Sequence, residues 1–216
     1  MKFENTRVMN FEGAIRGMRN PLESWDKSDS FFGVVDRLGT KDLDLMQRLI
    51  KAGDADAKFL RQIFVCVDVT APLYFFKEFD TYKINTTTNS TSTMHKIQSK
   101  PITMDCFEMD DYTNVEVVNG QEANMDDCWA QILNICEFLR QQYVATKDRR
   151  YWKELIRILP EGWLQTRTFT CNYANLRNMY FQRKNHKLSE WHSFCDWVET
   201  LPYAKELLTY VPKKNN

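Results

Sequence analysis

The chain mixes strand-like and helix-like stretches without the strand–helix–strand rhythm of a parallel sheet. Runs rich in β-branched and aromatic residues, which favour strands, lie at 62–69 (QIFVCVDV), 113–118 and 163–170 (WLQTRTFT). Helical patterns or starts lie at 41–52, 71–79 (APLYFFKEF), 126–147, 150–158, 173–183 and 188–200. This mixture predicts an α+β fold. The length of 216 residues predicts a single domain over 1–216, with two small domains as the alternative.

Residue types at the predicted helix ends and faces sharpen these assignments. Thr40 is expected to cap the helix at 41–52, and Gly53 to end it. Pro72 suits the first turn of the helix that follows it. The helix at 126–147 carries an apolar stripe of Trp129, Ile132, Leu133, Cys136 and Leu139. Trp191, Phe194 and Trp197 recur at helical spacing, which predicts core or subunit contacts.

Bulk properties exclude several classes of partner. Lys plus Arg and Asp plus Glu both number 29, so no net charge draws the chain to nucleic acid or to a membrane. The six cysteines and three histidines show no metal-ligand spacing, and no metal site is expected. No apolar run approaches membrane-spanning length, and no signal core is visible, which predicts a cytoplasmic protein with reduced thiols. No Rossmann or P-loop glycine fingerprint is present.

Two stretches are unusual without matching such a motif. Residues 81–96 (TYKINTTTNSTSTMHK) are mostly Thr, Ser, Asn and Tyr, directly after an apolar run. They are either a solvated loop or a polar cradle for an oxygen-rich ligand. Residues 17–30 (GMRNPLESWDKSDS) have the composition of a functional loop but carry no readable motif.

Residues 158–191 carry a more specific pattern. Leu159-Pro160 ends a helix, Thr170-x-Asn172 ends a strand, and Arg183 follows Asn172 by eleven positions. This order resembles the C-terminal signature of the flavin-dependent thymidylate synthases. Residues 69–83 resemble the family's helix leading into its Arg-His-Arg signature, and 89–92 (NSTS) resemble its Asn-Glu-x-Ser segment.

The resemblance implies an α+β subunit of a homotetramer whose active sites lie between subunits. It implies conversion of dUMP to dTMP with FAD, NADPH and methylenetetrahydrofolate. The nucleotide-binding residues that it implies are Arg183, which holds the dUMP phosphate, with Glu78, Asn89, Ser90 and Ser92. The flavin-binding residues that it implies are Thr81, Tyr82, Lys83, Asn172 and Asn178. It assigns no catalytic side chain.

The sequence departs from the family's pattern at several positions. Thr81-Tyr82-Lys83 stands in place of Arg-His-Arg, and Ser90 in place of a glutamate. The other replacements are Met94 and Ile156 for arginines, and Asp56 and Arg61 in the family's histidine-and-glutamate flavin segment. Two functions follow: a divergent enzyme of this family, or a nucleotide-binding sensor or sequestering protein on the same tetrameric scaffold.

Several of these residues have a second interpretation. Asn172 also suits a helix N-cap, and Arg183 also suits the surface of a helix. Tyr82 could stack on a ring system, since it lies in a polar context. The three histidines, His95, His186 and His192, are expected at the surface or at helix caps.

Overall fold

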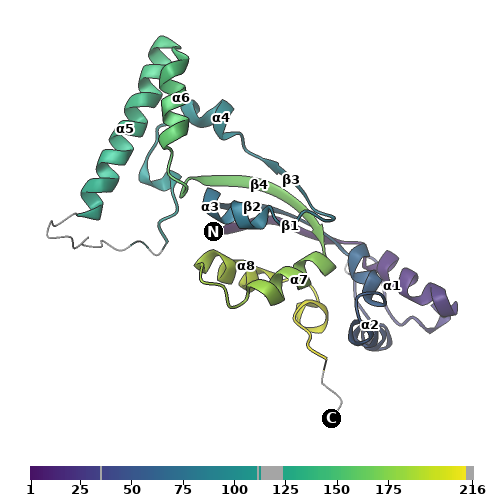
Figure 1. The fold of residues 1–216 in the computed structure, drawn as a ribbon. Coiled ribbons are helices and arrows are strands. Elements are labelled where there is room, and N and C mark those ends of the chain that lie inside the picture. Colours follow the sequence, from purple (N-terminus) through teal and green to yellow (C-terminus); the bar gives the residue numbers. More distant parts are fainter. Residues whose placement is uncertain (35, 111, 113–123, 213–216) are drawn as a thin grey trace. The chain divides into compact units, whose positions relative to one another are not determined.

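The computed structural model describes residues 1–34, 36–110, 112 and 124–212. The predicted strand at 113–118 lies outside these residues. The chain divides into two compact units (Figure 1). Unit 1 comprises Met1, Thr70–Asp80 and Ser90–Arg167, and unit 2 comprises Lys2–Val69, Thr81–Asn89 and Thr168–Asn216. The prediction of a single domain stays a prediction.

One antiparallel sheet of four strands runs in the order β1-β2-β4-β3. Its strands are β1 (Lys2–Met9), β2 (Phe64–Pro72), β3 (Thr87–Ser90) and β4 (Leu164–Asn172). The sequence predicted β2 and β4 but not β1 or β3, because both edge strands are largely polar and exposed. Since helices accompany this antiparallel sheet, the α+β prediction is confirmed.

The helices of unit 1 are α3 (Leu73–Phe79), α4 (Thr93–Lys96), α5 (Met125–Thr146) and α6 (Arg149–Ile158). Pro72 is the N-cap of α3 rather than a residue of its first turn. Asn124 and Asp148 cap α5 and α6, each accepting a hydrogen bond of 2.9 Å from a backbone N–H. The predicted stripe of α5 packs here: Cys136 is fully buried beside Leu155 of α6, and the other members are partly buried.

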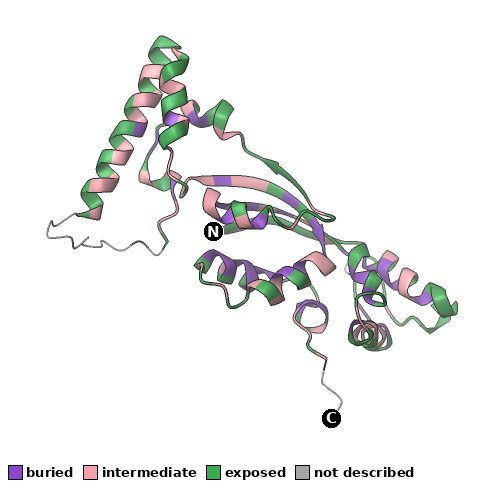
Figure 2. Ribbon diagram, in the orientation of Figure 1, coloured by how far each residue is buried: buried purple, intermediate pink, exposed green. Residues whose placement is uncertain are grey.

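The helices of unit 2 are α1 (Phe11–Arg19), α2 (Thr40–Ala52), α7 (Tyr173–Arg183) and α8 (Ser189–Glu199), with a π-helical turn at Ala204–Leu208. Trp191, Phe194 and Trp197 of α8 are buried, as Figure 2 shows for this helix, so their prediction as core residues is confirmed. Tyr173 at the start of α7 is also buried and meets Phe11 of α1 edge-on at 5.8 Å. Aromatic packing therefore fills the core of unit 2.

The start of α2 corrects one prediction. Gly39, not Thr40, is the N-cap residue, and glycine has no side chain that could accept a hydrogen bond from the helix. Asp29 takes that role from the preceding loop, accepting from the backbone N–H groups of Lys41 at 2.9 Å and Asp42 at 3.1 Å. The C-terminal prediction is confirmed, since Gly53 follows the helix with φ of 119°.

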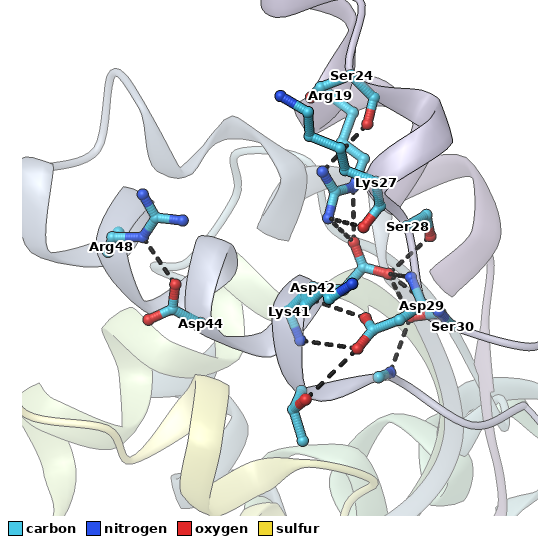
Figure 3. Close-up of polar contacts among 12 residues, drawn as sticks. Arg19, Ser24, Lys27, Ser28, Asp29, Ser30, Lys41, Asp42, Asp44 and Arg48 are labelled. Atoms are coloured by element: carbon cyan, nitrogen blue, oxygen red, sulfur yellow. Dashed lines mark hydrogen bonds and ion pairs between the residues drawn. The ribbon is translucent and has the colours of Figure 1, made fainter.

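A buried ion pair fastens the loop between α1 and α2 (Figure 3). Asp42 is fully buried and Arg19 is 5% exposed, and a guanidinium nitrogen lies 2.6 Å from the carboxylate. Ser28 and Ser30 donate hydroxyl hydrogen bonds of 2.7 and 2.6 Å to the same carboxylate. Arg19 also donates to the carbonyl oxygen of Ser24 at 3.1 Å. The stretch at 17–30 is thus ordered around one carboxylate.

The environment of Asp42 keeps its carboxyl group ionised. Burial alone raises its pKa, but hydrogen bonds from Ser30, Ser28 and Arg19 outweigh burial and leave the pKa below its ordinary value. Because the folded-state pKa is lowered, the ionised carboxylate stabilises the fold above the unfolded-state pKa. That stabilisation is lost as the pH falls through the folded-state value.

Removing this carboxylate should destabilise unit 2 strongly. In Asp42→Ala the charge of Arg19 stays buried without its partner, a situation that costs about 3–5 kcal/mol. The matched control is Asp44→Ala on the same helix, whose ion pair with Arg48 is exposed and contributes at most about 1 kcal/mol. Urea denaturation followed by circular dichroism measures both free energies of unfolding. Equal losses in the two variants would contradict this assignment.

Candidate functional site

The junction between β4 and α7 is built around Asn172. Its side chain is buried and accepts a hydrogen bond of 3.0 Å from the backbone N–H of Asn175, while its own N–H donates to Asn175 Oδ1 at 3.3 Å. This reciprocal pair is a capping box, formed here by two asparagines. The interpretation of Asn172 as an N-cap is confirmed.

A cavity of about 730 Å³ in unit 2 lies beside this junction. It is lined by Ile50, Asp54, Ala57, Leu60, Arg61, Ile84, Asn85, Asn172, Ala174, Asn175, Arg177, Asn178 and Phe181. Four of these are asparagines and two are arginines, against one carboxylate, so the lining is rich in neutral and cationic hydrogen-bond donors. Such a lining suits a ligand with ring heteroatoms and phosphate oxygens.

The side chains of Asn175 and Arg177 connect the wall of this cavity formed by α7 to neighbouring segments. Asn175 donates through Nδ2 to the carbonyl oxygen of Ile84 at 2.9 Å, which ties the loop containing Asn85 to α7. Asn85 has φ of 57°, a left-handed conformation that asparagine tolerates well. Arg177 donates from one nitrogen to the carbonyl oxygens of Leu207 and Leu208, both at 3.0 Å. Arg177 therefore stabilises the π-helical turn, and burial lowers its pKa.

Arg61, in contrast, is exposed, and within the described ranges the structure shows no ion pair to it. The sequence resemblance indicated Arg61 only as a replacement in the family's flavin segment, and it did not indicate Asn85, Asn175 or Arg177. An Asn-x-x-Asn spacing at the end of a predicted strand was the available signal for Asn175, because asparagine is a preferred N-cap residue.

A second cluster in unit 2 surrounds the predicted phosphate ligand, Arg183. This residue ends α7 and is half-buried, and its Nε donates to Tyr82 Oη at 2.8 Å. Its guanidinium carbon lies 4.8 Å from the ring centroid of Trp191. Tyr82 in turn donates to Gln182 Oε1 at 2.9 Å and meets Trp191 edge-on at 6.1 Å. Arg183 is therefore a packed arginine rather than a solvated one.

The other predicted residues are distributed over both units. Unit 2 contains Thr81, Lys83 and Asn89, all exposed, together with Asn172 and the exposed Asn178 at the 730 Å³ cavity. Unit 1 contains Glu78, Ser90 and Ser92. Within unit 2 the structure thus groups Asn172 with Asn178, and Tyr82 with Arg183.

The polar stretch at 81–96 is not a single loop. Its centre, β3, is exposed at every position, and its end forms α4. Ser92 caps α4, accepting from the backbone N–H of His95 at 3.1 Å, and its Oγ lies 2.7 Å from His95 Nδ1. His186 and His192 lie near each other, with His192 Nε2 2.8 Å from the carbonyl oxygen of His186. His95 and His192 are exposed, as expected, whereas His186 is half-buried against Trp191 and accepts a hydrogen bond from the backbone N–H of Leu188.

Three of the six cysteines, Cys136, Cys171 and Cys195, are buried. Burial raises the pKa of the Cys136 and Cys171 thiols, and raises that of Cys195 to about 11, so these thiols stay protonated at neutral pH. In the part of the chain that the structure describes, no cluster of His, Cys, Asp or Glu could hold a metal ion. Nor is any helix there long and apolar enough to cross a bilayer.

Comparison with known proteins identifies the fold. No family model matches the sequence, and no curated protein matches it. Among solved structures, flavin-dependent thymidylate synthase ThyX from Helicobacter pylori complexed with FAD and dUMP matches with a TM-score of 0.68 and 16% identity, over 96% of this chain and 97% of that one.

A UMP/dUMP methylase, PolB from Streptomyces cacaoi bound with 5-Br dUMP, matches with a TM-score of 0.61 and 13% identity, over 96% of this chain and 94% of that one. Both matches extend over nearly the whole of each chain, whereas the motifs that carried the sequence resemblance cover only part of this chain. The chain therefore has the fold of the flavin-dependent thymidylate synthases, as its sequence resemblance predicted.

Proposed function

We propose that this protein is a divergent flavin-dependent thymidylate synthase that converts dUMP to dTMP, using FAD, NADPH and methylenetetrahydrofolate. The observation that carries the proposal is the fold match to a ThyX structure holding both FAD and dUMP. Two groups of residues in unit 2 support it, namely the asparagine-lined cavity and the Arg183 cluster. The cytoplasmic location and the absence of nucleic-acid partners stay predictions.

The cavity residues fit the chemistry of a flavin. Asn178 and Asn85 offer amide groups that pair with ring carbonyls and ring nitrogens, and Arg61 offers charge for a phosphate. Asn172 supports this wall by fixing the start of α7. Bound FAD supplies the redox chemistry, and the protein's part is to bind and orient.

Arg183 fits the role of phosphate ligand. A guanidinium is the side chain best suited to bidentate contact with a phosphate, and Tyr82 and Trp191 fix its orientation before any ligand arrives. Such preorganisation lowers the entropy cost of binding. Tyr82 thereby gains a positioning role that the replaced Arg-His-Arg signature did not suggest.

The second candidate is a nucleotide-binding protein without redox chemistry. It is favoured by the replacement of the family's Arg-His-Arg by Thr81-Tyr82-Lys83, of which Thr81 and Lys83 are exposed. A protein that keeps Arg183 but loses charged flavin contacts would still bind dUMP. Flavin binding therefore separates the two candidates.

The role of Arg183 is testable through dUMP affinity. Arg183→Ala should weaken dUMP binding by about 2–4 kcal/mol, because a charge-assisted phosphate contact is lost. Thr87→Ala and Ser92→Ala should each cost less, since neutral hydrogen bonds contribute about 0.5–1.5 kcal/mol. Isothermal titration calorimetry on the folded variants measures this.

Lys187→Ala is the matched control, since Lys187 is an exposed cation close to α7. Because Arg183 is half-buried, Arg183→Lys serves as a second variant that keeps the charge and most of the packing but loses the bidentate geometry. An unchanged dUMP affinity in both Arg183 variants would make the residue purely structural.

Flavin binding is the direct test of the proposed enzyme. We expect the protein to bind FAD reversibly and more weakly than a family member with the full signature. The missing charged contacts are each worth roughly 1.5–3 kcal/mol, and two such losses correspond to about two to four decades in affinity. The measurement is a titration with FAD followed by the visible flavin spectrum.

Failure to bind FAD, with dUMP binding intact, would leave the non-catalytic candidate. Retention of stoichiometric FAD throughout purification would instead show that other residues replace the lost contacts. Asn178→Ala tests the cavity directly and should weaken FAD binding without changing the fold, since Asn178 is exposed.

Assembly into a homotetramer belongs to the same proposal. In unit 1, Ile135 and Phe138 lie three positions apart on α5 and are 51% and 54% exposed, so they form an apolar face that suits a subunit interface. Sedimentation velocity at micromolar concentration should report a tetramer, and Ile135→Glu with Phe138→Glu should shift it to smaller species. A wild-type monomer would contradict the tetramer.

A further inference from the structure

Three side-chain hydrogen bonds in unit 2 join the Arg183 cluster to the asparagine-lined cavity. Arg183 Nε donates to Tyr82 Oη at 2.8 Å, and Tyr82 Oη donates to Gln182 Oε1 at 2.9 Å. Gln182 Nε2 in turn donates to Asn178 Oδ1 at 2.9 Å, and Asn178 lines the cavity. These four residues therefore form a continuous relay from the proposed phosphate ligand to the cavity wall.

The chemistry of Arg183 fixes the direction of every bond in the relay. A guanidinium group can only donate, so the Tyr82 oxygen must accept from Arg183, and the single hydroxyl hydrogen of Tyr82 is left for Gln182. The side-chain oxygen of Gln182 accepts that hydrogen, so its amide nitrogen is the group that donates to Asn178. The relay thus occupies the oxygen of Asn178 and leaves its amide nitrogen, Nδ2, as a donor for a ligand.

The neighbouring asparagines of the cavity wall are bound to the backbone instead. Asn175 Oδ1 accepts from the backbone N–H of Asn172 at 3.3 Å, and Asn175 Nδ2 donates to the carbonyl oxygen of Ile84 at 2.9 Å. Asn172 Oδ1 accepts from the backbone N–H of Asn175 at 3.0 Å. Asn178 differs from both, because the side chain that orients it leads to Arg183.

One end of the relay is packed, and the other is open to water. Tyr82 and Arg183 are half-buried beside Trp191, whereas Gln182 and Asn178, four positions apart on α7, are exposed. Water competes with exposed hydrogen bonds, so their net contribution is small. The orientation of Gln182 therefore depends on its bond to the packed Tyr82 hydroxyl, and the orientation of Asn178 depends on Gln182.

We propose that Gln182 is a positioning residue that sets the amide orientation of Asn178 and, through Tyr82, the orientation of Arg183. Because Asn178 then presents an N–H donor, the ligand group opposite it is an acceptor, such as a carbonyl oxygen or an unprotonated ring nitrogen. The inference rests on the proposed function for the identity of the ligands, FAD in the cavity and dUMP at Arg183. Gln182 itself does not line the cavity.

The relay is tested first without a ligand. NMR spectroscopy of protein labelled with 15N-asparagine records the side-chain amide resonances of Asn178, which Asn178→Ala identifies by their loss. Tyr82→Phe keeps the aromatic ring but removes the hydroxyl, and it should shift these resonances although two hydrogen bonds separate Tyr82 from Asn178. Unchanged resonances in both Tyr82→Phe and Gln182→Met would overturn the relay.

Calorimetry with FAD and dUMP then measures the effect on binding. Gln182→Met, which keeps the length of the side chain but lacks the amide, should weaken each ligand by roughly two- to tenfold, the equivalent of one neutral hydrogen bond. Tyr82→Phe/Gln182→Met should bind FAD no more weakly than Gln182→Met alone, because both changes break the same relay. Additive losses of FAD affinity would overturn the proposal.

The matched control is Asn185→Met, which replaces an exposed amide just after α7, outside the relay and the cavity. It should bind FAD and dUMP as the wild type does, and an equal weakening in this control would overturn the role of Gln182. The bond between Gln182 and Asn178 could also serve only to stabilise the helix. A lower melting temperature of Gln182→Met with both affinities unchanged would establish that role and overturn the proposal.

Failure of the proposed function gives a different pattern of results. A wild type that binds neither FAD nor dUMP would refute the proposed enzyme. If Tyr82→Phe still shifts the Asn178 resonances of that protein, the result supports Gln182 as the residue that orients Asn178. Binding of both ligands with no effect of Gln182→Met on either affinity would instead overturn the positioning role and leave the proposed function standing.

Discussion

The reciprocal hydrogen bonds between Asn172 and Asn175 fix the start of α7, which forms one wall of the asparagine-lined cavity of unit 2. They satisfy the backbone at the point where β4 becomes α7, and a helix cannot start in a buried place without such partners. Because Asn175 also holds the carbonyl oxygen of Ile84, the same junction positions the loop beside the cavity. One pair of asparagines thus serves folding and site formation together.

Arg183 lies at the other end of that helix, where Tyr82 and Trp191 hold its guanidinium group. In this chain Tyr82 occupies the centre of the altered signature, and its hydroxyl holds the Nε of Arg183. A neutral residue therefore orients the cation, where the family's pattern has a charged or titratable one. Under the proposed function, this exchange would keep a phosphate ligand at Arg183 while reducing the charge available to a flavin, so that nucleotide and flavin affinity could change independently.

The parts of the fold that depend on local pattern were predictable, and the parts that depend on distant partners were not. The stripe of α5 and the aromatic spacing of α8 indicated both helices, since apolar periodicity survives in the sequence. The edge strand β3 was not visible, because its four residues are all polar and exposed and therefore show no alternation of apolar and polar side chains, although threonine itself favours strands. The cap of α2 was assigned to Thr40, because the side chain that accepts the hydrogen bonds at this helix start belongs to Asp29, eleven positions before Thr40 in a loop. Arg183 and Asn172 were found through resemblance, whereas Asn85 and Asn175 were found only from the cavity that they line.

The buried Arg19–Asp42 ion pair orders the loop between α1 and α2. An ion pair in such a place contributes little net free energy relative to apolar packing, so its retention calls for another reason. Here the pair has a geometric role, since Arg19 binds the carbonyl oxygens of Ser24 and Lys27 and Asp42 binds the hydroxyl of Ser28. Hydrophobic residues in place of the pair could give the same free energy of unfolding, but they could not donate hydrogen bonds to the carbonyl oxygens of Ser24 and Lys27. The loop would then lose its ordered conformation. The pair is therefore best understood as the interaction that orders the loop between α1 and α2.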